Sequence, residues 1–131
     1  MKPRKFLLLM SKNETVCGCK KFLLETRGHY RVLEARDPDA MHTLLATQDV
    51  SLVLIDLDTN ASHVAQNVKE FSASLPVVLF SSLLSSNEYD IGNADALLTR
   101  DSTTVELLEC VAILTMRSEK MQQRCRMQHK Q

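Results

Sequence analysis

Two uninterrupted apolar runs constrain the fold more than any other feature of this 131-residue chain. Positions 6–10 read Phe-Leu-Leu-Leu-Met, and positions 52–55 read Leu-Val-Leu-Ile. An apolar residue at every position, rather than at every second one, is typical of a strand whose two faces are both covered. Such strands belong to parallel sheets flanked by helices, so the runs predict an α/β protein.

Strand-like and helix-like segments alternate along the rest of the chain. Strands are predicted at residues 6–10, 30–35, 50–57, 75–80 and 94–99. Parallel neighbours require crossover connections, and right-handed crossovers place helices on both faces of the sheet. The alternation therefore predicts a single (βα)5 doubly wound parallel sheet of the flavodoxin-like kind.

Apolar spacing and capping residues define the helices between these strands. In the first helix the apolar positions are Val16, Cys19, Phe22 and Leu23, and Gly28 is expected to take the left-handed conformation just past its end. Asp37 and Pro38 are suited to start the second helix, with Met41, Leu44 and Leu45 facing inward, and Val64, Val68 and Phe71 mark the third. Residues 83–91 are rich in Ser and Asn, so at most a short helix is expected there.

The last helix is expected to be long and to end in a basic segment. Thr103 and Glu106 have the spacing of a capping box. Four apolar residues, Leu107, Leu108, Val111 and Leu114, would pack on the sheet. Residues 117–131 carry five basic residues against one acidic residue, so the sequence divides into a body at 1–116 and a basic helical extension or linker at 117–131. A linker or dimerisation helix is the favoured interpretation of this extension, ahead of a partner-binding helix or a frayed end.

Composition narrows the classes of function. The 16 basic and 16 acidic residues cancel, so net charge gives no reason to expect a nucleic-acid partner. No apolar run reaches the length of a membrane span, and the four cysteines lack the spacing of a secreted disulfide scaffold, so we expect a soluble cytoplasmic protein. Cys17 and Cys19 would point about 200° apart on a helix, which argues against a metal site there.

Polar residues follow the predicted strands at the edge of the sheet where ligands bind in folds of this kind. They are Ser11, Lys12 and Asn13 after the first strand, Asp56 and Asp58 at the third, Ser81 and Ser82 after the fourth, and Arg100 after the fifth.

Taken together, residues 5–116 resemble the receiver domain of bacterial two-component response regulators. Residues 51–56 resemble its phosphoacceptor strand, residues 77–82 its fourth strand ending in Ser or Thr, and residues 93–100 its Gly-Ala-Asp-x-aromatic-Leu-Thr-Lys stretch. Glu-Ala-Arg-Asp at 34–37 resembles the family's approach to its second helix. The resemblance implies that Asp56 is the phosphoacceptor, that Ser81 contacts the phosphoryl group, and that Arg100 takes the place of the lysine that neutralises it.

The departures from the family pattern bear most directly on function. Where the family carries two acidic residues that hold Mg²⁺, this chain has Ser11 and Lys12. Mg²⁺ prefers carboxylate ligands, so these positions and Asp58 form a degenerate metal site and no cofactor is expected. Lys12 or Arg100 is instead expected to form an ion pair with Asp56. The aromatic switch position is Leu97, which has no ring to rotate.

Two functions remain open on these residues. The first is a divergent, non-enzymatic receiver domain, independent of phosphorylation or weakly phosphorylated, that acts as a protein-interaction or dimerisation module. The alternative is an active receiver that accepts a phosphoryl group on Asp56 from a histidine kinase, with Asn13, Glu14 or Asp58 rebuilding a Mg²⁺ site. Expected partners are a histidine kinase, an output domain or a second copy of the chain. A small flavodoxin-like enzyme is disfavoured, because no phosphate-binding glycine loop follows the first strand.

Overall fold

The computed structural model describes residues 4–56, 61–81, 94–99 and 102–129, with the backbone alone at 61–62 and 118–129. Its five strands are β1 (Phe6–Met10), β2 (Arg31–Ala35), β3 (Val50–Asp56), β4 (Val77–Phe80) and β5 (Ala96–Leu98). They form one parallel sheet in the order β2-β1-β3-β4-β5. The helices of the described residues are α1 (Glu14–Thr26), α2 (Pro38–Thr47), α3 (Ala61–Phe71) and α4 (Thr104–His129). The predicted fold class is confirmed.

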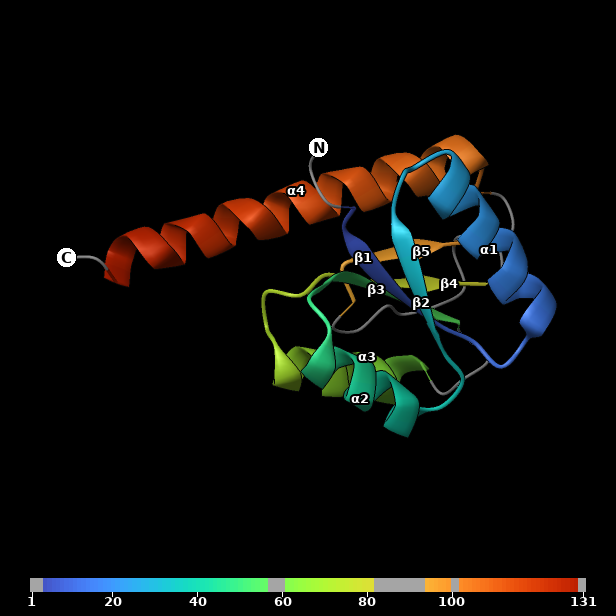
Figure 1. Ribbon diagram of the computed structural model, residues 1–131, viewed down its shortest axis with the longest axis horizontal. Coiled ribbons are helices and arrows are strands. Elements are labelled where there is room, and N and C mark those ends of the chain that lie inside the picture. Colours follow the sequence, from blue (N-terminus) through green and yellow to red (C-terminus); the bar gives the residue numbers. More distant parts are fainter. Residues whose placement is uncertain (1–3, 57–60, 82–93, 100–101, 130–131) are drawn as a thin grey trace.

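The helices cover both faces of the sheet, with α1 and α4 on one side and α2 and α3 on the other (Figure 1). Successive side chains of a strand point to opposite faces, so the run in β1 serves two cores at once. Leu7 and Leu9 lie in the core under α1 and α4, whereas Leu8 and Met10 lie in the core over α2 and α3. All four are essentially inaccessible to solvent. Burying each contributes about 1.5–3 kcal/mol, which explains why β1 tolerates no polar residue.

Side-chain caps fix where the helices begin. Asn13 Oδ1 accepts hydrogen bonds from the backbone N–H groups of Thr15 and Val16, at 3.0 and 3.2 Å. The predicted caps at Asp37 and Thr103 are confirmed: the Asp37 carboxylate accepts from the Ala40 N–H at 2.7 Å, and the Thr103 hydroxyl accepts from the Glu106 N–H at 3.1 Å.

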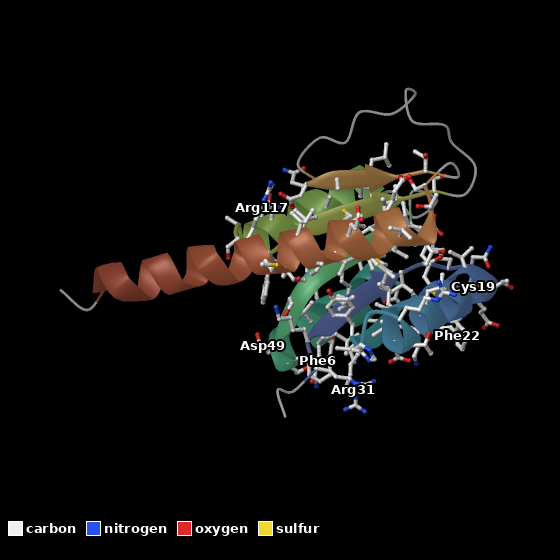
Figure 2. All side chains as sticks on the ribbon, turned by 90° about the horizontal axis from the view of Figure 1, so that it is seen from above. Phe6, Cys19, Phe22, Arg31, Asp49 and Arg117 are labelled. Atoms are coloured by element: carbon white, nitrogen blue, oxygen red, sulfur yellow. The ribbon has the colours of Figure 1, made fainter. Side chains whose placement is uncertain are left out.

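The predicted inner face of α1 is wrong in part. Cys19 is exposed and the Phe22 side chain is 65% exposed, and Figure 2 shows both on the outer side of the helix. Cys17 and Leu24 are the buried residues instead. Lys20, about one helical turn from each, also lies on the inward side and lines a pocket. A lysine within the inward stripe breaks the apolar pattern, which is why spacing alone chose the wrong residues.

Two further predictions about helix residues need correction. The left-handed residue after α1 is His29, with φ of 58°, and not Gly28. Gly28 is required for a different reason, since a Cβ there would lie 2.7 Å from the Tyr30 ring and 2.9 Å from the Leu24 carbonyl oxygen. On α3, Phe71 is 53% exposed and lies outside the core that Val64 and Val68 enter.

The predicted inner faces of the second and last helices agree with the structure. Met41 and Leu45 of α2 are buried, as are Leu107 and Val111 of α4. Helix α4 runs on through position 117 without a break and extends beyond the sheet (Figure 1). The short helix predicted at 83–91 lies outside the described residues. Within the described part of the chain, no helix combines the length and apolarity needed to cross a membrane.

Candidate functional site

The carboxyl ends of β1, β3 and β4 lie side by side in the middle of the sheet, so the residues at these ends meet. Ser11 follows β1, Asp56 ends β3 and Ser81 follows β4. All three are buried, with 1%, 5% and 6% of their surface exposed. Three buried polar residues at one sheet edge form the candidate site, as the strand pattern predicted.

A direct hydrogen bond joins the first two of these residues. Ser11 Oγ donates to Asp56 Oδ2 at 2.7 Å, and Ser11 Oγ in turn accepts from the Asn13 N–H at 3.1 Å. The Ser11 backbone is itself tied to β2, because its N–H donates to the Ala35 carbonyl at 3.2 Å. The hydroxyl is therefore held in place by both neighbouring segments. A short bond to a carboxylate in a buried setting is of the stronger, charge-assisted kind.

The predicted ion pair between Lys12 and Asp56 is not formed. Lys12 is exposed, and among the ion pairs of the described residues none includes it. The neighbouring acidic residue, Glu14, pairs with Arg36 at 2.8 Å between Glu14 Oε1 and Arg36 Nη1. Lys12 follows a residue whose side chain points into the sheet edge, so its own side chain points to solvent.

The remaining predicted site residues lie on β4 and β5 or beyond the described residues. The Ser81 N–H donates to the Leu98 carbonyl at 2.9 Å, which anchors the end of β4 to β5. Leu97, at the predicted switch position, is partly buried against the core over α2 and α3. Asp58, Ser82 and Arg100 fall outside the described residues, so an Arg100 contact with Asp56 stays a prediction.

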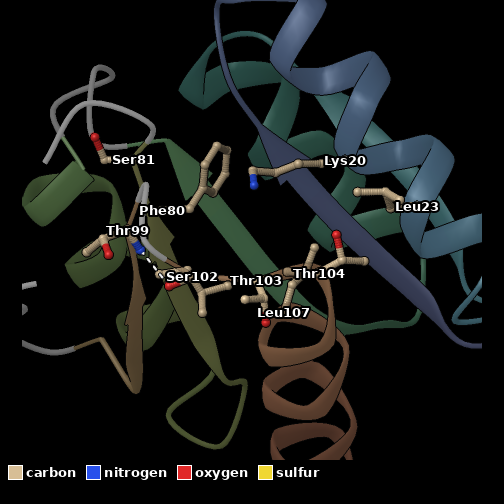
Figure 3. Close-up of a pocket in the computed structure, with 10 residues that line it drawn as sticks. Lys20, Leu23, Phe80, Ser81, Thr99, Ser102, Thr103, Thr104 and Leu107 are labelled. Atoms are coloured by element: carbon tan, nitrogen blue, oxygen red, sulfur yellow. Dashed lines mark hydrogen bonds between the residues drawn. The ribbon is translucent and has the colours of Figure 1, made fainter. Parts of the chain in front are cut away.

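Lys20 of α1 is the functional candidate that sequence reasoning missed. Its Nζ lies 4.8 Å from the centre of the Phe80 ring, within the range of a cation–π contact, and Phe80 is the β4 partner of Asp56 in the sheet (Figure 3). Burial lowers the pKa of the Lys20 ammonium, and the Asp56 carboxylate partly opposes this effect. The available signal was its spacing of four residues from both Val16 and Leu24, which places it on the sheet-facing side of the helix.

Several solved structures with the same architecture are described as receiver domains of response regulators or of signalling proteins. The signal receiver domain of an HD domain-containing protein from Pseudomonas fluorescens has a TM-score of 0.79 and 18% identity, over 95% of this chain and 96% of that one. A response regulator receiver domain protein from Clostridium thermocellum has a TM-score of 0.74 and 17% identity, over 89% and 98% of the two chains. NtrX from Brucella abortus has a TM-score of 0.83 and 15% identity, over 95% of this chain and 29% of NtrX.

This chain has the fold of a response regulator receiver domain. No protein-family model and no curated protein matches its sequence. At identities below one fifth the likeness establishes the receiver fold and leaves the roles of individual residues to the geometry of this chain.

The donor set that the described residues place at this edge of the fold does not fit Mg²⁺. The ion takes oxygen ligands in a near-octahedral arrangement and is usually held by one or two carboxylates. Among the described residues one carboxylate lies at this edge, that of Asp56, and one of its oxygens is already engaged by the Ser11 hydroxyl. No three His, Cys, Asp or Glu side chains come together within the described residues.

Cys17 lies beside the candidate site, but its thiol is not a candidate reactive group. Its thiol is buried and lies 3.7 Å from the Ser11 carbonyl oxygen. Burial, followed by the negative charge of Glu34, raises the pKa of the Cys17 thiol. A neutral thiol is a poor nucleophile and a poor metal ligand, so Cys17 is a packing residue.

Proposed function

We propose that this receiver-fold chain is a divergent signalling domain that works through protein contacts, as an interaction or dimerisation module, without Mg²⁺-dependent phosphorylation of Asp56. The observation that carries the proposal is the hydrogen bond from Ser11 to Asp56. At the position where the resemblance to receiver domains implies an acidic metal ligand, this chain has Ser11, a neutral hydrogen-bond donor.

The chemistry of phosphoryl transfer explains why this replacement matters. The reaction depends on positioning and on neutralising charge on the transferred group, and metal ions supply much of that neutralisation. Without a second carboxylate, Asp56 gives a divalent cation little to bind. The Ser11 hydroxyl also draws electron density from the Asp56 carboxylate, which makes Asp56 a weaker nucleophile. Both effects slow phosphorylation.

An exposed apolar surface on α4 supports the part of the proposal that concerns protein contacts. Val105, Ile113 and Met116 are 58%, 51% and 55% exposed. They lie within about a quarter turn of one another around the helix axis, because spacings of 8 and 11 residues bring side chains close to the same side of a helix. We define Val105, Ile113 and Met116 as the α4 patch. It leads directly into the part of α4 that extends past the sheet, and we propose a second copy of the chain as its partner.

Sedimentation velocity across a range of concentrations tests the proposed module. The parent chain should form a dimer to the same extent with and without beryllofluoride and Mg²⁺, which together mimic a phosphoryl group. Ile113→Glu should weaken the dimer at least tenfold, because burying an unpaired charge in an interface is unfavourable. Phe71→Glu is the matched control, since Phe71 is equally exposed but lies on α3 across the sheet. A dimer that depends on beryllofluoride, or a chain that stays monomeric, would contradict the proposal.

The alternative function is an active receiver that accepts a phosphoryl group on Asp56 from a histidine kinase. It is favoured by one observation, namely that Asp56 and Ser81 are both buried at adjacent strand ends. Two of the three residues that would rebuild its metal site have other roles in the structure: Asn13 caps α1 and Glu14 pairs with Arg36. The third, Asp58, lies outside the described residues. If the alternative holds, Glu14→Gln should weaken Mg²⁺ binding in a metal titration.

A further inference from the structure

A small pocket lies between α1, the ends of β4 and β5, and the start of α4 (Figure 3). Its volume is about 80 Å³. Five of its lining residues carry hydroxyl groups: Ser81, Thr99, Ser102, Thr103 and Thr104. Among the described residues that line it, one carries a charge, the ammonium of Lys20. A pocket of this size holds several water molecules, so it has room for a tetrahedral ion of five heavy atoms.

Lys20 brings a positive charge to this pocket, and among the described residues no carboxylate forms an ion pair with it. Its close contact is with the face of the Phe80 ring. An ammonium has three N–H donors, and a ring face satisfies at most one direction. The partial burial of the ammonium is unfavourable unless an anion or water accepts from the others.

The hydroxyl groups around Lys20 still have hydrogens to donate. Ser102 Oγ accepts from the Thr99 N–H at 3.0 Å, and Thr103 Oγ1 accepts from the Glu106 N–H at 3.1 Å. A hydroxyl that accepts from a backbone N–H keeps its own O–H for another acceptor. These hydroxyls and Lys20 therefore present donors to the same space.

We propose that this pocket binds a phosphate group, as the free ion or as the head of a small phosphate monoester, through Lys20 and the hydroxyls of Ser102 and Thr104. The site differs from the phosphoacceptor site, because binding is non-covalent and Asp56 is not among the lining residues. The inference therefore stands apart from the proposed function. Phosphate binding in this pocket would let a ligand act on this edge of the sheet, although Asp56 itself is held by the hydrogen bond from Ser11.

Titration of the ¹⁵N-labelled full chain with inorganic phosphate, followed by NMR, tests the site. Saturable shifts should centre on the amides of Thr99, Ser102 and Thr104. Lys20→Met keeps a long side chain over Phe80 but removes the charge, and it should weaken binding at least tenfold, as expected for a lost charge-assisted hydrogen bond. Lys21→Met is the matched control, because Lys21 is the next residue of α1 and does not line the pocket. Its affinity should equal that of the parent.

Three further arms keep the proposal open to refutation. If Lys20→Met does not fold, Thr104→Val should weaken phosphate binding severalfold while the helix remains. Asp56→Asn should keep phosphate binding, and loss of binding in this variant would overturn the assignment to the pocket. O-Phosphoserine should bind in the same place if the ligand is a monoester, whereas binding of phosphate alone would assign the free ion. No saturable shift with either compound, or equal binding by Lys20→Met, would overturn the proposal.

Discussion

The hydrogen bond from Ser11 to Asp56 should be a measurable source of stability. Hydrogen bonds to charged groups contribute about 1.5–3 kcal/mol, and this one is buried at both ends and only 2.7 Å long. Asp56 has a further polar contact, so Ser11→Ala does not leave the carboxylate without a partner. We therefore expect Ser11→Ala to lower the free energy of unfolding by about 2 kcal/mol, which is roughly a 30-fold change in the unfolding equilibrium.

A double-mutant cycle measured by urea unfolding isolates this interaction. The four proteins are the parent, Ser11→Ala, Asp56→Ala and the double variant, and the expected coupling energy is about 1.5 kcal/mol or more. Ser72→Ala is a control for the loss of a hydroxyl, because Ser72 Oγ lies 3.5 Å from its nearest hydroxyl partner, Ser74. It should change stability by less than about 0.5 kcal/mol. A coupling energy below about 0.5 kcal/mol would refute the view that Ser11 restrains Asp56.

Other features of the fold give four more predictions. Gly28→Ala should destabilise the chain by about 1–3 kcal/mol in urea unfolding, because the new Cβ would meet backbone and ring atoms below 3 Å. His29→Asn should instead raise the melting temperature slightly, since asparagine tolerates a φ of 58° better, and a fall would refute this reading of the turn. Asp95→Ala should lower the free energy of unfolding by about 1–2 kcal/mol in the same assay. Asp95 Oδ2 accepts from Lys69 Nζ at 2.7 Å and from the Val77 N–H at 2.8 Å, and an unchanged free energy of unfolding would show that neither bond contributes to stability. In thiol labelling at neutral pH mapped by peptide mass, Cys19 should react well before Cys17, whose thiol is buried, and equal rates would contradict that burial.

The sheet could be predicted from the sequence because its signal is local and strong. An uninterrupted apolar run such as Phe6–Met10 has few structural explanations, and such runs placed β1 and the centre of β3, while the alternation of strand-like and helix-like segments placed the other strands. The inner face of α1 was harder to predict, because Lys20 occupies an inward position and Phe22 an outward one. Tertiary packing decided which side of that helix faces the sheet, and the apolar spacing alone could not show it.

The candidate site followed from topology, but its contacts did not. Adjacent strand ends brought Asp56, Ser11 and Ser81 together, as expected for a doubly wound sheet. Which neighbour contacts Asp56 depends on side-chain direction after β1, and there Ser11 points inward while Lys12 is exposed. Lys20 of α1 adds a positive charge near Asp56, and its only signal in the sequence was its helical spacing from Val16 and Leu24.

The most direct test of the central claim is the intact mass of the chain after incubation with acetyl phosphate and Mg²⁺. The parent should show no phosphoryl adduct, and neither should Asp56→Asn. The double variant Ser11→Asp, Lys12→Asp, which restores an acidic pair after β1, should gain an adduct that is lost when Asp56→Asn is added. An adduct on the parent that depends on both Mg²⁺ and Asp56 would contradict the account and establish the chain as an active receiver.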